Sequence, residues 1–296
     1  MSDAKTLIVI TGPTGSGKTG MAIEVARRLG CEIISADSRQ MYRGIPIVTA
    51  APTSEELAAA KHHLVGCLDL TDYYSAAQFE SDALRIANEL WRTTPYVIVC
   101  GGSMMYLDAL CHGIDDLPDV SPEVRASALA VYTDGGLEAL TEELSKIDPQ
   151  YLATAPDLKN HKRLVHALEI SWEAGRPYSS MLTGRKTERP FRILKFATSL
   201  PREELFDRIN LRVSRMIADG LEVEARSVYP LRHLNSLNTV GLKEMFAMFD
   251  GTMDRDTAIA RIGKNTRVYA KKQMTWLKRD PSVIYINSAN EIIDSL

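Results

Sequence analysis

No stretch of this chain is apolar for long enough to cross a membrane. The N-terminal residues also lack the charged segment and long apolar run of a secretion signal, because the chain leads directly into a short apolar run at residues 7–10. We therefore expect a cytoplasmic protein without a membrane anchor.

Cysteine is scarce, because the 296 residues include only four, and none of them forms a C-x-x-C pair. Cys31 and Cys100 fall in or beside apolar patterns, which predicts buried, reduced thiols. We expect neither a disulfide framework nor a cysteine metal site from this spacing. The chain also has no internal repeat and no low-complexity linker.

A large excess of one charge is missing as well, because the formal net charge is only −3. The basic residues are nevertheless concentrated in the second half of the chain, where they cluster at residues 159–166, 185–195 and 255–279. A single cluster usually indicates only a solvated face of the protein. Three of them favour a polyanionic partner such as a nucleic acid.

The chain does contain a phosphate-binding motif near its start. An apolar run is followed by a segment that fits G-x-x-x-x-G-K-[ST], and a helical pattern comes next. The segment consists of Gly12, Pro13, Thr14, Gly15, Ser16, Gly17, Lys18 and Thr19. In this context backbone N–H groups surround a phosphate, Lys18 adds a positive charge and the Thr19 hydroxyl ligates Mg²⁺. The motif predicts a P-loop that binds a phosphate chain.

Strand and helix patterns alternate around this motif. Strand patterns occupy residues 7–10, 32–35 and 96–100, and helical patterns occupy residues 18–29, 54–62, 76–91 and 103–111. Residues 115–190 contain only helical patterns, and further strand patterns follow at residues 192–197 and 283–286. We predict an α/β fold with a P-loop NTPase-like parallel sheet core, formed by residues 1–114 and 191–296. Residues 115–190 are predicted to form a helical insertion domain.

An acidic residue is absent from the end of the strongest strand pattern, where a P-loop hydrolase usually organises Mg²⁺ and water. That strand pattern ends in Val99-Cys100-Gly101-Gly102-Ser103. The carboxylate expected near the phosphate is instead Asp37, which is either a general base or a residue that forms a turn. Ser103 is either a hydrogen-bond donor to the reacting groups or the N-cap of the next helix.

Several segments, in the same order, match one known family. They are residues 12–19, 35–44, 62–64, 99–103, 162–169, 208–212 and 269–276. In these segments the chain resembles the tRNA dimethylallyltransferase family, and the resemblance covers essentially the whole chain. The Asp-Ser-Arg-Gln segment and the Ala-Lys-Lys-Gln-x-x-Trp segment are more diagnostic than the P-loop.

The resemblance implies transfer of a dimethylallyl group from dimethylallyl pyrophosphate to N6 of adenosine 37 in tRNA. The P-loop then holds the pyrophosphate with Mg²⁺, and the implied catalytic residues are Asp37, Ser103 and Arg212. The resemblance also implies a monomer that binds the anticodon stem-loop. The implied tRNA-binding residues are Asp37, Ser38, Arg39, Gln40, Ser103, Arg125, Lys162, Arg163, Leu164, Val165, His166, Gly241, Lys243, Lys271 and Lys272.

The chain departs from the usual residues of this family at three positions. Ser103 stands for a usual Thr, Ala51 for a usual Lys, and Leu242 for a usual Tyr near the expected tRNA contact. Because an aromatic ring stacks or hydrogen-bonds at such a surface, the last change removes a possible contact.

Three other functions stay open at this point. They are an adenylate dimethylallyltransferase that acts on a free nucleotide, a small-molecule kinase that uses ATP on the same P-loop, and a tRNA-binding paralogue without activity. The helical insertion and residues 269–276 count against the free-nucleotide enzyme, because a mononucleotide needs no such extended surface.

Overall fold

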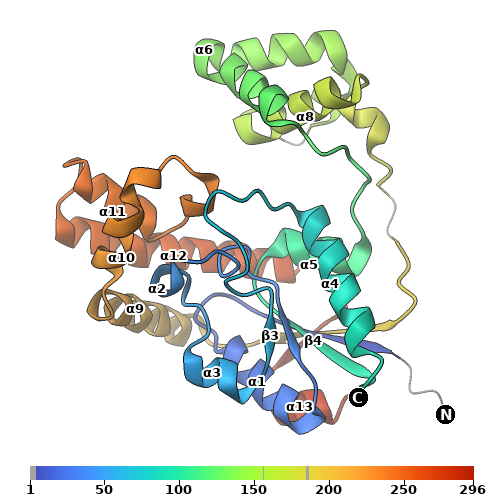
Figure 1. Ribbon diagram of the computed structural model, residues 1–296, viewed down its shortest axis with the longest axis vertical. Helices are drawn as coiled ribbons and strands as arrows, with labels where there is room; N and C mark the ends of the chain where they lie inside the picture. The colour runs from blue at the N-terminus through green and yellow to red at the C-terminus, as the bar shows by residue number, and fades with distance from the viewer. Residues whose placement is uncertain (1–4, 156, 185–186) are drawn as a thin grey trace. The chain divides into compact units, whose positions relative to one another are not determined.

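The structure is a computed structural model that describes residues 5–155, 157–184 and 187–296 (Figure 1). The chain divides into two compact units, one formed by Met1–His112 with Glu188–Leu296 and the other by Gly113–Thr187. The corresponding predicted boundaries were 1–114 with 191–296, and 115–190. Arg185 and Lys186, which belong to one predicted basic cluster, lie outside the described residues.

Within the described part of the first unit, six parallel strands form one sheet in the order β3-β2-β4-β1-β5-β6. This confirms the predicted P-loop-like α/β fold. The strands are β1 (Thr6–Thr11), β2 (Ile33–Ser35), β3 (His62–His63), β4 (Tyr96–Cys100), β5 (Arg192–Thr198) and β6 (Val283–Ile286). Only β3 has no counterpart among the predicted strands, because two polar residues give no apolar pattern. The carboxyl ends of β1, β2 and β4 share one edge of the sheet.

Helices precede and follow the insertion within the first unit. The helices before it are α1 (Lys18–Leu29), α2 (Pro46–Thr49), α3 (Ser54–Ala59), α4 (Ala76–Leu90) and α5 (Met104–His112). The helices after it are α9 (Arg202–Ala218), α10 (Leu221–Val228), α11 (Leu242–Phe249), α12 (Arg255–Leu277) and α13 (Ala289–Ile293), with short 3₁₀ turns η2 (Tyr229–Leu231) and η3 (Asn235–Leu237). The predicted helices at 18–29, 76–91 and 103–111 are confirmed to within one residue.

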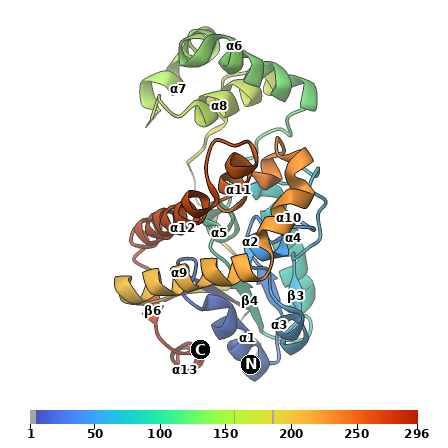
Figure 2. The same ribbon diagram turned by 90° about the vertical axis from the view of Figure 1, so that its left-hand side faces the viewer.

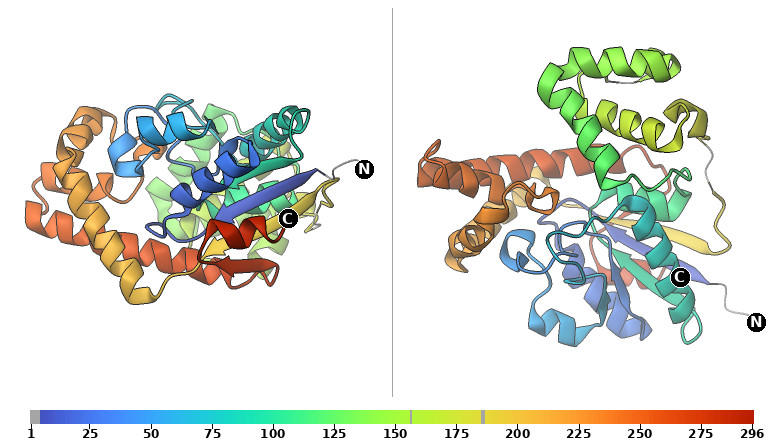
Figure 3. Two further views of the ribbon diagram at one scale, coloured as in Figure 1. Left: turned by 90° about the horizontal axis from the view of Figure 1, so that it is seen from below. Right: turned by 45° about the horizontal axis from the view of Figure 1, so that its top comes forward.

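Both faces of the sheet are covered by helices. Leu7 and Val9 of β1 enter a core with α4 and α5, whereas Ile8 and Ile10 enter a core with α1 and α13 (Figure 3). Successive side chains of a strand point to opposite faces, so one continuous apolar run supplies both cores. The buried sheet fixes the positions of the loops at its carboxyl edge.

The helices α9 to α12 form a separate hydrophobic core beside this edge (Figure 2). Helix α9 buries an apolar stripe with a spacing of three to four residues, which consists of Leu205, Ile209, Val213 and Met216. Ile45 and Val48, which flank or belong to α2, pack into the same core. This packing holds the loop that follows β2 against α9 and α12.

The second unit is helical, as predicted. It contains α6 (Pro122–Ile147), α7 (Pro149–Thr154), α8 (His161–Ala174) and the 3₁₀ turn η1 (Tyr178–Met181). Helix α6 is interrupted at Gly136, which departs from helical geometry with a φ of 68°. Figure 3 shows α6 and α8 packed side by side around a common apolar core.

The cysteines are free thiols, and the predicted burial of Cys31 and Cys100 is confirmed. Cys111 is also buried, whereas Cys67 is exposed. No helix in the described ranges combines the length and the apolar character needed to cross a membrane.

Candidate functional site

The predicted P-loop forms the turn between β1 and α1. Gly12 has a φ of +145°, and a Cβ atom at this position would lie 2.1 Å from Thr198 Oγ1, so only glycine fits. Gly17 is the N-cap of α1 and has a φ of 87°. The first N–H groups of a helix have no partner within the helix, and the positive end of the helix dipole lies at the same place. The start of α1 is therefore suited to an anion.

Partly buried positive charges lie at this turn. Burial lowers the pKa of Lys18, and it also lowers the pKa of Arg212, while the carboxylate of Asp37 acts in the opposite direction on both. Burial raises the pKa of Cys100 to about 12, so this thiol at the end of β4 is neutral at neutral pH. A bound anion would offset part of the cost of burying the two cations.

Helix α9 presents further positive charge to the P-loop. A hollow of about 490 Å³ lies between them, and Arg208, Arg212 and Arg215 line it together with Lys18 and Thr19. The sequence analysis gave a role only to Arg212 among these arginines. Arg208 and Arg215 lie four and three residues from Arg212, so all three arginines share one face of the helix. This spacing could have predicted the other two from the sequence.

The surroundings of Thr19 bear on the predicted magnesium ion. Thr19 lies in the first turn of α1 and lines the cavity that also contains Lys18 and Asp37. Among the described residues there is no group of three or more His, Cys, Asp or Glu side chains that would hold a metal. A single hydroxyl is a suitable ligand for Mg²⁺ when substrate phosphates and water supply the remaining oxygens.

Asp37 follows β2 and faces the same region. Its Oδ1 atom accepts hydrogen bonds from the backbone N–H groups of Arg39 (3.0 Å) and Gln40 (3.4 Å). Asp37 therefore forms the turn that was one of its two predicted roles. Both hydrogen bonds end on Oδ1, and Asp37 also lines two neighbouring cavities. The turn is therefore compatible with a role of the carboxylate as proton acceptor.

Ser103 connects the end of β4 to this turn. Its hydroxyl oxygen accepts a hydrogen bond from the Ser38 N–H (2.8 Å) and donates one to Ser38 Oγ (3.2 Å). Its own N–H donates to the carbonyl of Ala36 (3.1 Å). The hydroxyl is directed at the loop that carries Asp37, and its contacts position that loop.

The side chains of Arg39 and Gln40 hold the walls of the site together. The Arg39 guanidinium donates to the carbonyls of Asn235 (2.8 Å) and Ser236 (3.1 Å). The Gln40 amide donates to the carbonyl of Ala50 (2.9 Å). Both polar groups are thus engaged within the protein. Arg39 ties the loop after β2 to η3, and Gln40 ties it to the end of α2.

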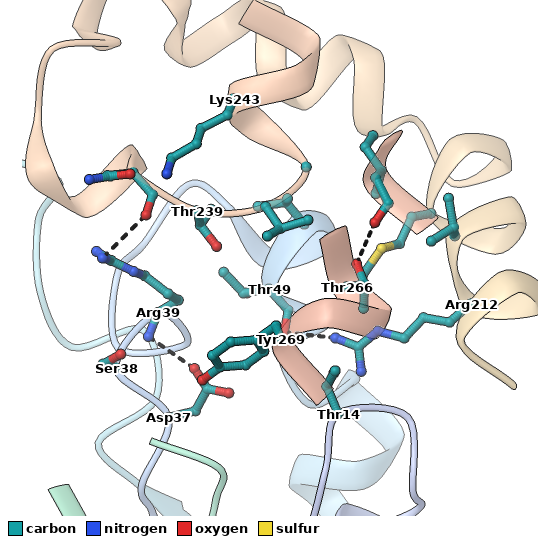
Figure 4. A pocket seen from close by; sticks show the side chains of 17 residues that line it. Thr14, Asp37, Ser38, Arg39, Thr49, Arg212, Thr239, Lys243, Thr266 and Tyr269 are labelled. Atoms are coloured by element: carbon teal, nitrogen blue, oxygen red, sulfur yellow. Dashed lines mark hydrogen bonds between the residues drawn. The ribbon is translucent and has the colours of Figure 1, made fainter. Parts of the chain in front are cut away.

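Two cavities meet at Asp37. The smaller, of about 70 Å³, lies beside the P-loop, and the larger, of about 340 Å³, lies between the loop after β2 and helices α9, α11 and α12 (Figure 4). Of the described residues, four line both cavities, namely Thr14, Asp37, Arg212 and Tyr269. The larger cavity also has apolar walls formed by Val48, Val213, Met216, Val240 and Ile262. A phosphate-bearing molecule and a second substrate can therefore meet at Asp37.

Tyr269 and Gln273 are site residues to which the sequence analysis gave no role. Gln273 is buried, and its Oε1 accepts a hydrogen bond from the Thr14 N–H (2.8 Å), while its Nε2 donates to the Gly102 carbonyl (2.9 Å). The Tyr269 hydroxyl donates to the same carbonyl (3.4 Å). A Cβ atom on Gly102 would lie 2.3 Å from Gln273 Nε2, which explains the glycine there. The i, i+4 spacing on α12 was the signal for this pair.

Comparison with known proteins identifies the family. The IPP transferase family profile matches residues 40–280. The tRNA dimethylallyltransferase 2 of Parabacteroides distasonis is 51% identical over 281 residues, which are 95% of this chain and 94% of that protein. The chain belongs to the tRNA dimethylallyltransferase family. The tRNA dimethylallyltransferase 1 of Phocaeicola vulgatus is similar too, with 52% identity over 282 residues, 95% of this chain and 94% of that one.

Solved structures of family members have the same fold. The tRNA isopentenylpyrophosphate transferase of Bacillus halodurans has a TM-score of 0.69 and 34% identity, and the match covers 96% of this chain and 90% of that one. A eukaryotic dimethylallyltransferase acting on tRNA has a TM-score of 0.80 and 25% identity, covering 96% of this chain and 74% of that one.

The residues that the family resemblance assigned to tRNA lie in both units. In the first unit, Lys271 and Lys272 are exposed on α12, and Lys243 with Gly241 lines the larger cavity. Leu242 is fully buried in the core of α9 to α12. The side chain of this leucine therefore contributes to core packing.

In the second unit, the predicted tRNA-binding residues lie on α6 and α8. Lys162, Arg163 and His166 are exposed, and His166 Nδ1 lies 2.9 Å from the buried Glu169 carboxylate. Arg125 lies 3.8 Å from the same carboxylate. Leu164 is fully buried in the core of this unit, so its side chain offers no surface to RNA, and we correct that assignment to core packing.

Proposed function

We propose that this chain transfers a dimethylallyl group from dimethylallyl pyrophosphate to N6 of adenosine 37, beside the anticodon of tRNA. The observation that carries this proposal is the junction of an anion site and a larger pocket at Asp37. The thiol of Cys100 occupies the strand end where a P-loop hydrolase has an acid. An anion site of this kind favours a pyrophosphate leaving group over nucleotide hydrolysis.

In this proposal the start of α1 binds the pyrophosphate of the donor. Lys18 and Arg212 supply positive charge at the point where negative charge develops during the reaction. Mg²⁺, when bound through Thr19 and the phosphates, supplies further positive charge for the leaving group. The arginines of α9 line the hollow that leads to this site and attract the anionic donor.

The transfer itself is balanced by groups of the substrates and Asp37. The bond between the allylic carbon and the pyrophosphate oxygen breaks, and its electron pair leaves with pyrophosphate. A bond forms between that carbon and N6, and the proton of the amine passes to Asp37. The apolar residues in the wall of the larger cavity suit the hydrocarbon group.

An adenine must leave its stack to reach such a pocket, so the enzyme must also bind the surrounding RNA. Lys271 and Lys272 on α12, together with Lys162 and Arg163 on α8, are exposed and suited to contact phosphates. We also propose that the protein acts as a monomer.

Product analysis tests this function. The purified chain is incubated with dimethylallyl pyrophosphate, Mg²⁺ and unmodified tRNA, and the digested nucleosides are analysed by mass spectrometry. We expect N6-dimethylallyladenosine at position 37 and none in a tRNA that carries guanosine there. Parallel reactions with free AMP as acceptor, or with ATP as donor, should give no transfer. Product from AMP alone would indicate the free-nucleotide enzyme, and phosphorylation by ATP would indicate a kinase.

A further inference from the structure

We propose that the aromatic ring of Tyr269 stabilises the positive charge that develops on the allylic group during transfer. This inference rests on the proposed function, because it requires an allylic pyrophosphate as donor. It assigns Tyr269 as a catalytic residue beside Asp37 and Arg212.

The position of Tyr269 is the first argument. Tyr269 lines both cavities, and among the described residues only Thr14, Asp37 and Arg212 do the same. The transferred carbon atoms must pass this junction, since pyrophosphate remains at the P-loop and the adenine comes from the larger cavity. Tyr269 is the one aromatic side chain of these four, and in Figure 4 its ring is seen between Asp37 and Arg212.

The orientation of the ring is fixed by its neighbours. The Tyr269 hydroxyl donates to the Gly102 carbonyl, which also accepts the shorter bond from Gln273 Nε2. Gln273 in turn binds the Thr14 N–H of the P-loop. The ring is therefore held in a defined relation to the donor site and does not need to reorganise as charge develops.

The protonation state of Tyr269 favours a role for its aromatic ring rather than for its hydroxyl group. Burial raises the pKa of Tyr269 to about 12, and the Asp37 carboxylate acts in the same direction. The phenol is consequently neutral at neutral pH and does not compete with Asp37 for the proton of the amine.

The transfer step itself creates a positive charge that an aromatic ring can stabilise. As the carbon–oxygen bond breaks, positive charge spreads over the allylic carbons, and the partly buried cations Lys18 and Arg212 disfavour this charge. The face of an aromatic ring is negative and attracts a cation within about 6 Å of its centre. Because the charge exists only near the transition state, this attraction raises the rate of transfer rather than the affinity for substrate.

The test measures single-turnover transfer at saturating tRNA and dimethylallyl pyrophosphate, so that substrate affinity does not limit the rate. Tyr269→Phe keeps the ring and loses only the long 3.4 Å bond to the Gly102 carbonyl, so its rate should stay within about 3-fold of the unmodified protein. Tyr269→Leu removes the ring and should be about 10- to 30-fold slower. Tyr285→Leu is the matched control, because Tyr285 is exposed on β6, outside both cavities, and its rate should not change.

A series of fluorinated rings at position 269 tests the same inference even if Tyr269→Leu fails to fold. Phenylalanines with one, two and three ring fluorines are placed at position 269, since they keep the shape of the ring and weaken its negative face. The transfer rate should fall stepwise with fluorination, while tRNA affinity and inorganic pyrophosphate affinity stay constant. A rate that is independent of fluorination would overturn the inference.

Two further outcomes would also overturn it. If the single-turnover rate falls as much in Tyr269→Phe as in Tyr269→Leu, the hydroxyl is the active group. If Tyr269→Leu weakens tRNA binding and leaves the single-turnover rate unchanged, the ring stacks on the adenine. Absence of product from the unmodified protein would instead contradict the proposed function, so the two failures are distinguishable.

Discussion

At the scale of single residues, the site depends on side chains that combine a structural and a chemical task. The carboxylate of Asp37 closes a turn through Oδ1 and also lines the cavities where the substrates meet. Ser103 binds Ser38 in the same loop. The two alternatives that the sequence left open for Asp37 are thus not exclusive, since one carboxylate has two oxygens.

The first prediction concerns Asp37. Asp37→Asn keeps an oxygen for the turn but removes the proton acceptor, so turnover should fall by about 10²- to 10⁴-fold. Binding of tRNA, measured by filter retention, should remain within a few-fold. Asp69→Asn, at an exposed carboxylate that pairs with Arg43, serves as the control and should retain full turnover. Turnover near the unmodified level in Asp37→Asn would leave this residue with a structural role alone.

The second prediction concerns the Ser103 hydroxyl. Ser103→Ala removes both hydrogen bonds to Ser38, and turnover should decrease by roughly 10- to 100-fold because the Asp37 loop is less firmly placed. Ser103→Thr restores the hydroxyl and should recover most of the rate. Steady-state kinetics on both variants test this prediction. If Ser103→Ala is as fast as Ser103→Thr, the hydroxyl does not position the Asp37 loop for catalysis.

At the scale of secondary-structure elements, α12 brings the acceptor side and the donor side of the site together. Lys271 and Lys272 are exposed, whereas the next residue, Gln273, is buried against the P-loop. Just beyond the helix, Asp280 pairs with the largely buried Lys195 of β5 at 2.6 Å. The helix is thereby attached to the sheet at one end and presents its lysines to solvent.

The third prediction concerns the exposed lysines of α12. Reversal of Lys271 and Lys272 to Glu should weaken tRNA binding and flatten its salt dependence, since each phosphate contact contributes roughly 0.7–0.9 to the log–log slope. Pyrophosphate affinity should not change. Lys162 and Arg163 of α8 should behave in the same way. An unchanged affinity and slope in the α12 variant would mean that these lysines only solvate the helix.

The fourth prediction concerns the anchor of α12. Burial alone would raise the pKa of Asp280, but hydrogen bonds from Lys195 and Ser282 outweigh it and lower the value from 3.8 to about 2. The ionised form therefore stabilises the fold above pH 3.8, and this contribution disappears as the pH falls to about 2.

Asp280→Asn tests this anchor. The variant should unfold at a lower urea concentration than the unmodified protein at pH 7, and the difference should shrink between pH 4 and pH 2. Asp294→Asn, near the C-terminus, is the control and should show little difference at either pH. A difference for Asp280→Asn that stays constant down to pH 2 would contradict the ion pair.

Sequence patterns predicted those elements whose apolar residues have a clear period. The strands β4 and β6 and the helix α1 have the predicted bounds, because the two strands are continuous apolar runs and the helix carries apolar residues at a regular spacing. The two-residue β3 and the role of Tyr269 were missed, since one has no apolar pattern and the other depends on contacts between residues more than a hundred positions apart. The side-chain contacts of Leu164 and Leu242 depend on tertiary packing, which a local motif does not contain.

At the scale of the whole molecule, the chain combines a P-loop core with a helical insertion. The core contains every residue that lines the two cavities, whereas the insertion carries a basic cluster on α8. The residues proposed to contact RNA are therefore found in both units, whereas the residues proposed for the chemistry all belong to the core. In the sequence, accordingly, the P-loop alone predicted a site for a phosphate chain, while the basic clusters favoured a nucleic-acid partner.

The proposed function requires that the P-loop of this chain holds a pyrophosphate leaving group and that the reaction consumes no nucleoside triphosphate. The most direct measurement follows pyrophosphate release and N6-dimethylallyladenosine formation in the same reaction with tRNA, dimethylallyl pyrophosphate and Mg²⁺, in the absence of ATP. The account predicts one pyrophosphate for each modified adenosine and no orthophosphate. A requirement for ATP, or release of orthophosphate in step with product, would contradict it.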